Sequence, residues 1–131
     1  MSHEADGCVV DASALLALLH SEPGAEIVEA AVERGAMSTI NWSEVCQRSI
    51  ARGVDTAALR ADVEALGLGI VPFTADDAEQ AANLWPATRR IGLSLGDRAC
   101  LALALRLGLP ALTADRSWLA LDLDLEIHLI R

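Results

Sequence analysis

The sequence predicts an α/β fold in which helices cover a mostly parallel sheet of about five strands. Short apolar runs rich in β-branched residues alternate with segments whose apolar residues recur at helical spacing. This alternation is typical of a parallel sheet, because the helices provide the crossovers that parallel strands need. The strands are expected at residues 7–11, 36–40, 69–73, 109–113 and 125–130.

The third of these runs, GIVPF, is expected at an edge of the sheet. Pro72 has no backbone N–H to donate to a neighbouring strand, which disfavours a central position. The segment 96–108 is apolar on nearly all sides, which predicts a helix buried between the sheet and another layer. Further helices are expected at residues 12–20, 25–34, 41–53, 55–67 and 74–85, with a helical turn at 115–121.

Length and composition fit one compact domain over residues 1–131. The chain has 131 residues, 53% of them hydrophobic, which is enough for one core and too few for two. No apolar run approaches the roughly 20 residues of a membrane span, and the N-terminal segment lacks a signal-peptide pattern. We therefore expect a cytoplasmic protein without membrane attachment.

The charged residues exclude several classes of function. A formal net charge of −9 argues against broad, non-specific binding of nucleic acid but leaves room for a local site. All ten basic residues are arginine, so there is no lysine for a P-loop, a Schiff base or a receiver-type phosphorylation site. Cys8, Cys46 and Cys100 have no CxxC spacing and are expected in the core, and the histidines match no metal-ligand spacing.

Four acidic residues from distant segments are predicted to meet at one edge of the sheet. The carboxyl ends of parallel strands gather at one edge, where open α/β folds bind ligands. Asp11 ends the first strand, Glu44 lies near the start of the helix after the second, and Asp115 follows the fourth. The helix 96–108 must run opposite to the strands, which brings Asp97 in its first turn to the same edge.

A cluster of carboxylates needs protons or a cation. Two unit charges about 4 Å apart repel by about 4 kcal/mol at an effective dielectric constant of about 20. Because the chain has no lysine, a hard divalent ion bound through oxygen atoms, Mg²⁺ or Mn²⁺, is the simplest solution. Such ions activate a water molecule and stabilise charge on a phosphate, so the pattern favours phosphodiester hydrolysis.

Each acid also has a structural interpretation. Asp11 could cap the helix that follows it, and Asp115 could open a turn. Glu44 and Asp97 each stand at the fourth position of a segment with capping-box spacing. Asp76-Asp77, which also follow a predicted strand, are interpreted as the cap and first turn of the next helix, outside the site.

Four segments carry a family resemblance: VVDASALLALL, NWSEV, LGDRACLALALRLGLPALTAD and TADRSW. In this order the chain resembles the PIN-domain nucleases and, within them, the compact VapC-type toxins of toxin–antitoxin pairs. The resemblance implies a three-layer α/β/α PIN-like fold. It assigns the catalytic and metal-binding acids to Asp11, Glu44, Asp97 and Asp115, and implies hydroxyls beside the metal at Ser13 and Thr113.

The resemblance also implies a function. It is that of a Mg²⁺- or Mn²⁺-dependent endoribonuclease, the toxin of a type II toxin–antitoxin system, which cuts a cellular RNA and is inhibited by a small antitoxin. Arginines near the acids are candidates for contact with RNA phosphates, namely Arg48, Arg52, Arg98 and Arg116. Their alternative is surface pairing, for instance between Glu44 and Arg48 at i, i+4.

Other interpretations stay open at this point. Apolar residues on the first and third predicted helices could form a homodimer seam or an antitoxin groove, or they could belong to the domain's own core. These residues are Leu15, Leu18, Leu19, Trp42 and Ile50. The alternative function is a non-catalytic PIN-fold interaction module that binds metal or a protein partner. A haloacid-dehalogenase-like phosphatase is disfavoured, because Ser13 replaces the second aspartate of that family's DxD motif.

Overall fold

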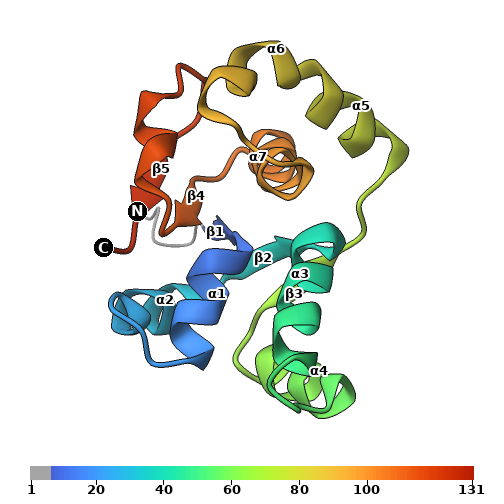
Figure 1. Ribbon diagram of the computed structural model, residues 1–131, viewed down its shortest axis with the longest axis vertical. Coiled ribbons are helices and arrows are strands. Elements are labelled where there is room, and N and C mark those ends of the chain that lie inside the picture. Colours follow the sequence, from blue (N-terminus) through green and yellow to red (C-terminus); the bar gives the residue numbers. More distant parts are fainter. Residues whose placement is uncertain (1–6) are drawn as a thin grey trace.

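The computed structural model describes residues 7–131 and forms a five-stranded sheet with helices on both faces (Figure 1). The strands are β1 (Cys8–Val10), β2 (Gly35–Ser38), β3 (Gly69–Val71), β4 (Ala111–Thr113) and β5 (Ile127–Leu129). The helices are α1 (Ala12–Leu19), α2 (Ala25–Val32), α3 (Thr39–Ile50), α4 (Thr56–Ala65), α5 (Ala75–Asn83), α6 (Trp85–Thr88) and α7 (Leu95–Leu107), with 3₁₀ turns η2 (Arg89–Ile91) and η3 (Arg116–Ala120). The first six residues of the domain predicted over 1–131 lie outside the described residues.

The sheet is parallel throughout, with the strand order β3-β2-β1-β4-β5. The predicted fold class is therefore confirmed, and β3 lies at an edge, as Pro72 indicated. β1 is central, and its Val10 lies opposite Leu112 of β4. This register places the residues that follow, Asp11 and Thr113, side by side at the carboxyl edge.

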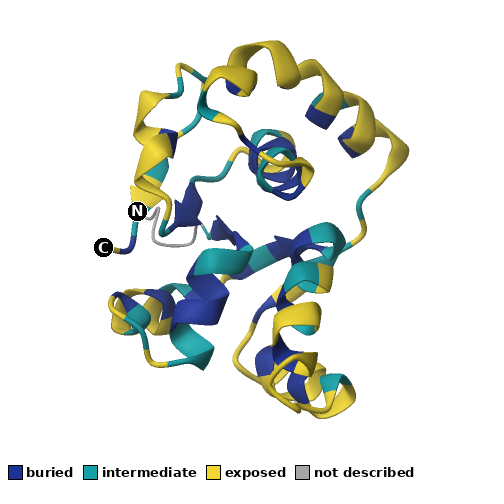
Figure 2. Cartoon of the chain, in the orientation of Figure 1, coloured by how far each residue is buried: buried dark blue, intermediate teal, exposed yellow. Residues whose placement is uncertain are grey.

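Side chains of the central strands alternate between two separate cores. Val10 and Leu112 face a core shared with α1, α2, α3 and α4. Val9 and Ala111 face the other core, which α5 and α7 cover. Figure 2 shows buried residues along the sheet and on the inner sides of the helices, with exposed residues outermost. The three layers expected from the resemblance are present.

Helix α7 lies inside the molecule, between the sheet and α5 (Figures 1 and 2). Every residue from Ala99 to Ala104 is buried, which confirms the prediction of a buried helix. A capping box of Ser94 and Asp97 begins the helix, and Gly108 ends it in a left-handed conformation. No helix within residues 7–131 is long and apolar enough to cross a membrane.

Predicted boundaries differ from the observed ones by up to three residues, and two of the differences have clear local reasons. The second strand ends at Ser38, because the Ser38 hydroxyl caps α3 and the helix begins already at Thr39. The helix expected over 74–85 ends at Asn83, and a short new helix follows with Pro86 in its first turn.

The apolar residues offered as a partner surface divide between core and surface. Leu15 is fully buried, so it belongs to the core of its own domain. Trp42 is partly buried, and Ile50 is 62% exposed. Cys46 is only partly buried, whereas the other two cysteines are buried as predicted.

Candidate active site

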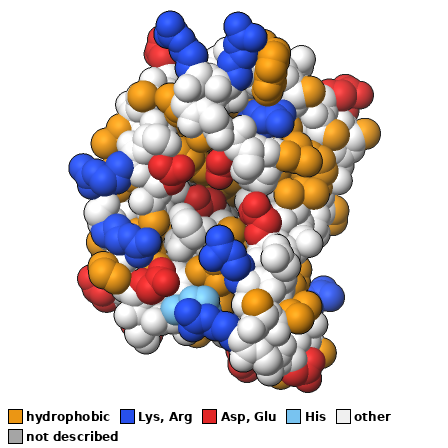
Figure 3. Space-filling model, viewed as in Figure 1, with side chains coloured by type: hydrophobic (Ala, Val, Ile, Leu, Met, Phe, Trp, Pro, Cys, Tyr) orange, Lys and Arg blue, Asp and Glu red, His pale blue; other side chains and the backbone are white. Residues whose placement is uncertain are grey.

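A cleft at the carboxyl ends of the strands contains all four predicted acids. It has a volume of about 660 Å³, and Asp11, Glu44, Asp97 and Asp115 line it. In the view of Figure 3, acidic side chains gather near the middle of the face with arginines around them. The structure thus brings together residues from four segments far apart in the sequence.

Asp11 is a buried carboxylate that accepts hydrogen bonds from neutral donors. It is 4% exposed and caps α1, with Oδ1 accepting from the Ala14 N–H and from the Ser13 hydroxyl, both at 2.8 Å. Oδ2 accepts from the Thr113 hydroxyl at 2.5 Å. Burial raises the pKa of Asp11 to about 6, and the negative charge of Asp97 adds to the rise, while the three hydrogen bonds oppose it.

The two hydroxyls expected beside the metal tie the ends of β1 and β4 together. Ser13 Oγ donates to Asp11 and accepts from the Ala114 N–H at 3.0 Å. Thr113 Oγ1 donates to Asp11 and accepts from the Asp115 N–H at 3.0 Å. These bonds fix the carboxylate of Asp11 and the backbone of Asp115 relative to each other.

Asp97 and Asp115 each keep one carboxylate oxygen away from their capping bonds. Asp97 Oδ2 accepts from the Ser94 N–H at 2.9 Å, and Asp115 Oδ1 accepts from the N–H and the hydroxyl of Ser117. Within residues 7–131, Asp97 Oδ1 and Asp115 Oδ2 accept no hydrogen bond. One oxygen of each is therefore available to a ligand in the cleft.

The negative charges of the cleft extend their influence to the buried thiol beneath it. Burial raises the pKa of Cys100 well above its usual range, and the charges of Asp11, Asp97 and Glu44 raise it further. The charges of three of the four acids thus act on the same thiol. Cys100 is an inert, protonated core residue.

Glu44 is held by Asn41. The sequence did not indicate a role for Asn41 in the site. The segment from Asn41 to Glu44 has capping-box spacing in the sequence, but α3 begins two residues earlier and Asn41 lies inside it. Its Nδ2 donates to Glu44 Oε1 at 3.0 Å and to the carbonyl oxygen of Gly96 at 2.9 Å. The contact with α7 spans 55 residues of sequence, so no local pattern could reveal it.

The structural interpretation of the acids holds for three of the four. Asp11 and Asp115 are N-caps, and Asp97 completes a capping box. Glu44 does not cap its helix, since Ser38 does so. Capping explains why three acids stand at helix starts, but it does not explain why all four line one cleft.

The four predicted arginines fall into two pairs. Arg48 and Arg52 line the cleft, and neither forms an ion pair within the described part of the chain, so the suggested Glu44–Arg48 pair is absent there. Arg98 turns away and donates to the Ala81 carbonyl at 2.9 Å, and Arg116 donates to the Arg131 carbonyl at 3.0 Å. Arg98 and Arg116 are not among the residues that line the cleft.

Arg131 and His20 also line the cleft, although the sequence did not single them out. Arg131 donates to the Pro23 carbonyl at 2.9 Å and lies 3.7 Å from Glu22. Its position follows β5, whose carboxyl end lies at the same edge, so strand topology was the signal available. His20 ends α1, and nothing in its sequence context indicated the cleft.

The oxygen atoms in the cleft that could bind a metal suit a hard divalent cation. They are carboxylate and hydroxyl oxygens, the chain has no lysine, and Asp11 has no cationic partner among the described residues. A second buried oxygen, Asn41 Oδ1, accepts no hydrogen bond from residues 7–131. In this conformation no three His, Cys, Asp or Glu side chains of residues 7–131 are already drawn together as a metal site.

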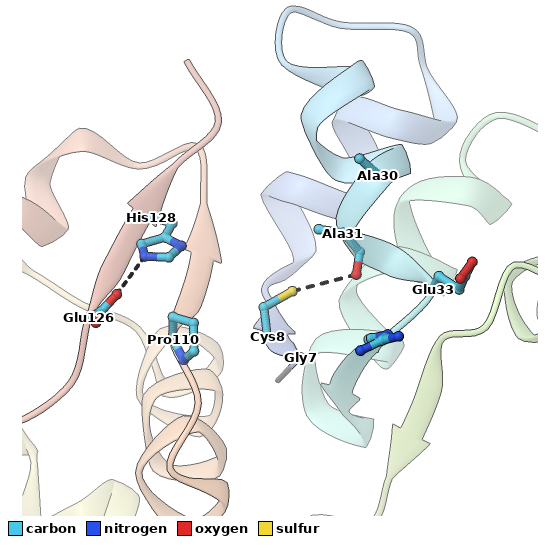
Figure 4. A pocket seen from close by; sticks show the side chains of 9 residues that line it. Gly7, Cys8, Ala30, Ala31, Glu33, Pro110, Glu126 and His128 are labelled. Atoms are coloured by element: carbon cyan, nitrogen blue, oxygen red, sulfur yellow. Dashed lines mark hydrogen bonds and ion pairs between the residues drawn. The ribbon is translucent and has the colours of Figure 1, made fainter. Parts of the chain in front are cut away.

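A second cavity of about 480 Å³ lies at the opposite, amino edge of the sheet (Figure 4). There the Cys8 thiol donates to the Ala31 carbonyl at 3.9 Å, and the His128 ring lies 2.8 Å from the Glu126 carboxylate. None of the four predicted acids lines this cavity. The chemistry indicated by the sequence is therefore confined to the carboxyl edge.

Comparisons with known proteins agree with this arrangement. Residues 8–123 match the PIN domain family, and no curated protein matches the sequence. A toxin–antitoxin complex from Klebsiella pneumoniae has a chain with a TM-score of 0.71 and 22% identity, over 87% of this chain and 92% of that chain. VapC20 of Mycobacterium tuberculosis, described as a sarcin-ricin loop cleaving toxin, has a TM-score of 0.71 and 21% identity, over 88% of this chain and 97% of that chain.

A third structure, DNA-bound VapBC from Salmonella typhimurium, has a TM-score of 0.68 and 14% identity, over 96% of this chain and 99% of that chain. At these identities the likeness to solved structures is one of fold. The family match, in contrast, extends over most of the sequence and includes the segments that carry all four acids. The chain therefore belongs to the PIN-domain family.

Proposed function

We propose that this protein is a metal-dependent endoribonuclease, the toxin of a type II toxin–antitoxin pair. The observation that carries the proposal is the convergence of Asp11, Glu44, Asp97 and Asp115 in one cleft of about 660 Å³. Asp11 in particular is buried, and no cationic side chain of residues 7–131 pairs with it, which is an unfavourable arrangement unless a cation binds. The family match and the fold of the neighbouring toxins support the same assignment.

The four acids would hold Mg²⁺ or Mn²⁺. When bound, such an ion supplies an activated water and charge stabilisation on the phosphate. Asp11 contributes a carboxylate whose position is fixed by Ser13, Thr113 and the start of α1. Asp97 and Asp115 contribute oxygens that their helix caps leave free.

RNA would be bound by the arginines at the edge of the cleft. Arg48 on α3, Arg52 in the turn that follows α3 and Arg131 after β5 supply positive charge beside the acids. This local charge answers the difficulty posed by a net charge of −9, because contact is needed only with the phosphates nearest the scissile bond. The structure gives Arg98 and Arg116 other partners, so the proposed phosphate contact is limited to the cleft arginines.

The proposed partners are a small antitoxin protein and a second copy of this chain. The Klebsiella pneumoniae neighbour is a toxin–antitoxin complex, and the Salmonella typhimurium neighbour is a VapBC assembly. Next to the cleft, Ile50 is 62% exposed, and Trp42 and Cys46 line a groove between α3 and α4. Exposed apolar surface of this kind favours a protein partner.

The test is cleavage of a structured RNA in EDTA, in Mg²⁺ and in Mn²⁺, by the wild-type protein and by Asp97→Asn. Asparagine can still accept the capping hydrogen bond, so this variant removes the charge and keeps the helix start. Asp76→Asn is the matched control, since Asp76 also lies in the first turn of a helix but outside the cleft. Metal-dependent cleavage that only Asp97→Asn loses supports the proposal. Binding of metal without cleavage would favour the non-catalytic interaction module.

A further inference from the structure

Asn41 lies near the start of α3 and connects Glu44 of that helix to the first turn of α7. Its side chain is 1% exposed and lies at the wall of the cleft. Nδ2 carries two hydrogens, one donated to Glu44 Oε1 and the other to the Gly96 carbonyl. Both partners are acceptors only, so the orientation of the amide is determined by its surroundings.

Gly96 leaves the space that the Glu44 carboxylate occupies. A Cβ atom built on Gly96 would lie 2.7 Å from both Cδ and Oε1 of Glu44, closer than real Cβ contacts permit. The backbone of Gly96 is ordinary helix, so glycine is not needed there for conformation. Glu44 therefore rests directly on the bare backbone of α7, next to Asp97.

The remaining oxygen of Asn41 has no partner. Oδ1 is shielded from solvent and accepts no hydrogen bond from residues 7–131. Two other buried polar atoms of residues 7–131, Arg98 Nε and Trp118 Nε1, are likewise unpaired, so this oxygen does not by itself indicate a ligand. The amide group of Asn41 is therefore held by its two Nδ2 hydrogen bonds alone.

We propose that Asn41 and Gly96 are positioning residues that hold the Glu44 carboxylate where it binds the metal. Asn41 supplies the positive end of its amide to one glutamate oxygen, and Gly96 provides room for the carboxylate beside Asp97. This inference rests on the proposed function, because it requires Glu44 to be a metal ligand. The competing view is that Asn41 merely fastens α3 to α7.

A double-mutant cycle separates the two views. Mn²⁺ binding is measured by calorimetric titration for the wild type, Asn41→Leu, Glu44→Ala and the double variant. We expect Asn41→Leu alone to weaken binding by about 10-fold, as loss of an outer partner of a ligand does, and to have no further effect once Glu44 is absent. Equal losses in both backgrounds would overturn the positioning role. Asn83→Leu, at an exposed site on α5, is the control and should bind like the wild type.

Gly96→Ala provides a second test that leaves Asn41 untouched. In the wild-type background the new methyl group forces the flexible end of Glu44 to move, so we expect weaker Mn²⁺ binding. In the Glu44→Ala background there is no carboxylate to displace, so Gly96→Ala should leave the remaining Mn²⁺ binding unchanged. Equal losses of Mn²⁺ binding in both backgrounds would overturn the inference, whether or not Asn41→Leu folds. If the wild-type protein binds no Mn²⁺, the proposed function fails together with the inference; binding without coupling overturns the inference alone.

Discussion

Two aspartates of this molecule have equally low solvent exposure and yet occupy opposite electrostatic situations. Asp11 at the carboxyl edge is 4% exposed, and Asp77 at the seam between α5 and α7 is 3% exposed. Asp77 accepts two hydrogen bonds from Arg106, at 2.7 and 3.0 Å, and this partner lowers its pKa. Asp11 has only neutral donors, and burial raises its pKa to about 6. The difference shows that a buried acid indicates a site only when the protein itself does not supply the counter-charge.

The largest expected effect comes from removing the charge of Asp11, and it is an effect on activity. Asp11→Asn should reduce metal-dependent RNA cleavage by about 1,000-fold or more, because the amide can keep the cap of α1 but offers the cation no charge. Initial rates on a fluorescently labelled RNA in Mn²⁺ measure this. In EDTA at pH 7 the variant should unfold at or above the wild-type temperature, since it removes a buried charge. A variant that is unfolded, with no effect specific to metal, would leave Asp11 as a helix cap alone.

The second prediction concerns the stability of the metal-free protein against pH. Because folding raises the pKa of Asp11 to about 6, the folded chain holds a proton that the unfolded chain has already lost near pH 4. Stability should therefore fall as pH rises from about 4 to about 6, by about 3 kcal/mol from this group. Asp77, with its lowered pKa, has the opposite sign and loses its contribution as the solution is acidified. Urea unfolding in EDTA across this range should show the fall in the wild type and not in Asp11→Asn.

The third prediction tests the paired aspartate. Asp77→Ala removes both the capping box with Thr74 and the acceptor for Arg106, and should destabilise the fold by about 2 kcal/mol. Urea unfolding at pH 7 measures this, with the exposed neighbour Asp76→Ala as the control. Metal binding and cleavage by the folded variant should be unchanged. A loss of metal binding would mean that the seam and the cleft are not independent regions.

The smallest expected effect separates the arginines of the two regions. Arg106 is engaged by Asp77, whereas Arg48 in the cleft forms no ion pair within residues 7–131. In the inactive Asp97→Asn background, Arg48→Gln should reduce the slope of log affinity for single-stranded RNA against log salt by about 0.7 to 1. Arg106→Gln should leave that slope unchanged. Fluorescence anisotropy over a series of NaCl concentrations measures both, and equal slopes for Arg48→Gln and wild type would exclude a phosphate contact.

The elements that sequence reasoning predicted are those whose signals are local. The alternation of strand and helix patterns, the edge position implied by Pro72 and the all-round apolar pattern of α7 each led to the observed element. The placement of the four acids also followed, because it needed only the topology of a parallel sheet and the direction of one helix. Strand ends carry that information without any knowledge of side-chain contacts.

The features that were missed depend on contacts between distant segments. Asn41 gains its role through Gly96, and the orientation of Arg98 is set by a carbonyl on α5. Neither contact leaves a periodic trace in the sequence. The start of α3 was misplaced for a different reason: Ser38 and Asn41 are both acceptable caps, and only the end of β2 decides between them.

The bond from the Thr113 hydroxyl to Asp11 joins residues 102 positions apart, and this separation determines when the cleft can form. During synthesis β1, β2 and β3 leave the ribosome first and can pair, while the place beside β1 that belongs to β4 stays open. Contacts of such long range form late in folding. A nascent chain would therefore carry Asp11 without the partners that orient it until the segment 111–113 emerges and pairs. Strand order alone thus delays the assembly of the cleft until β4 has been made.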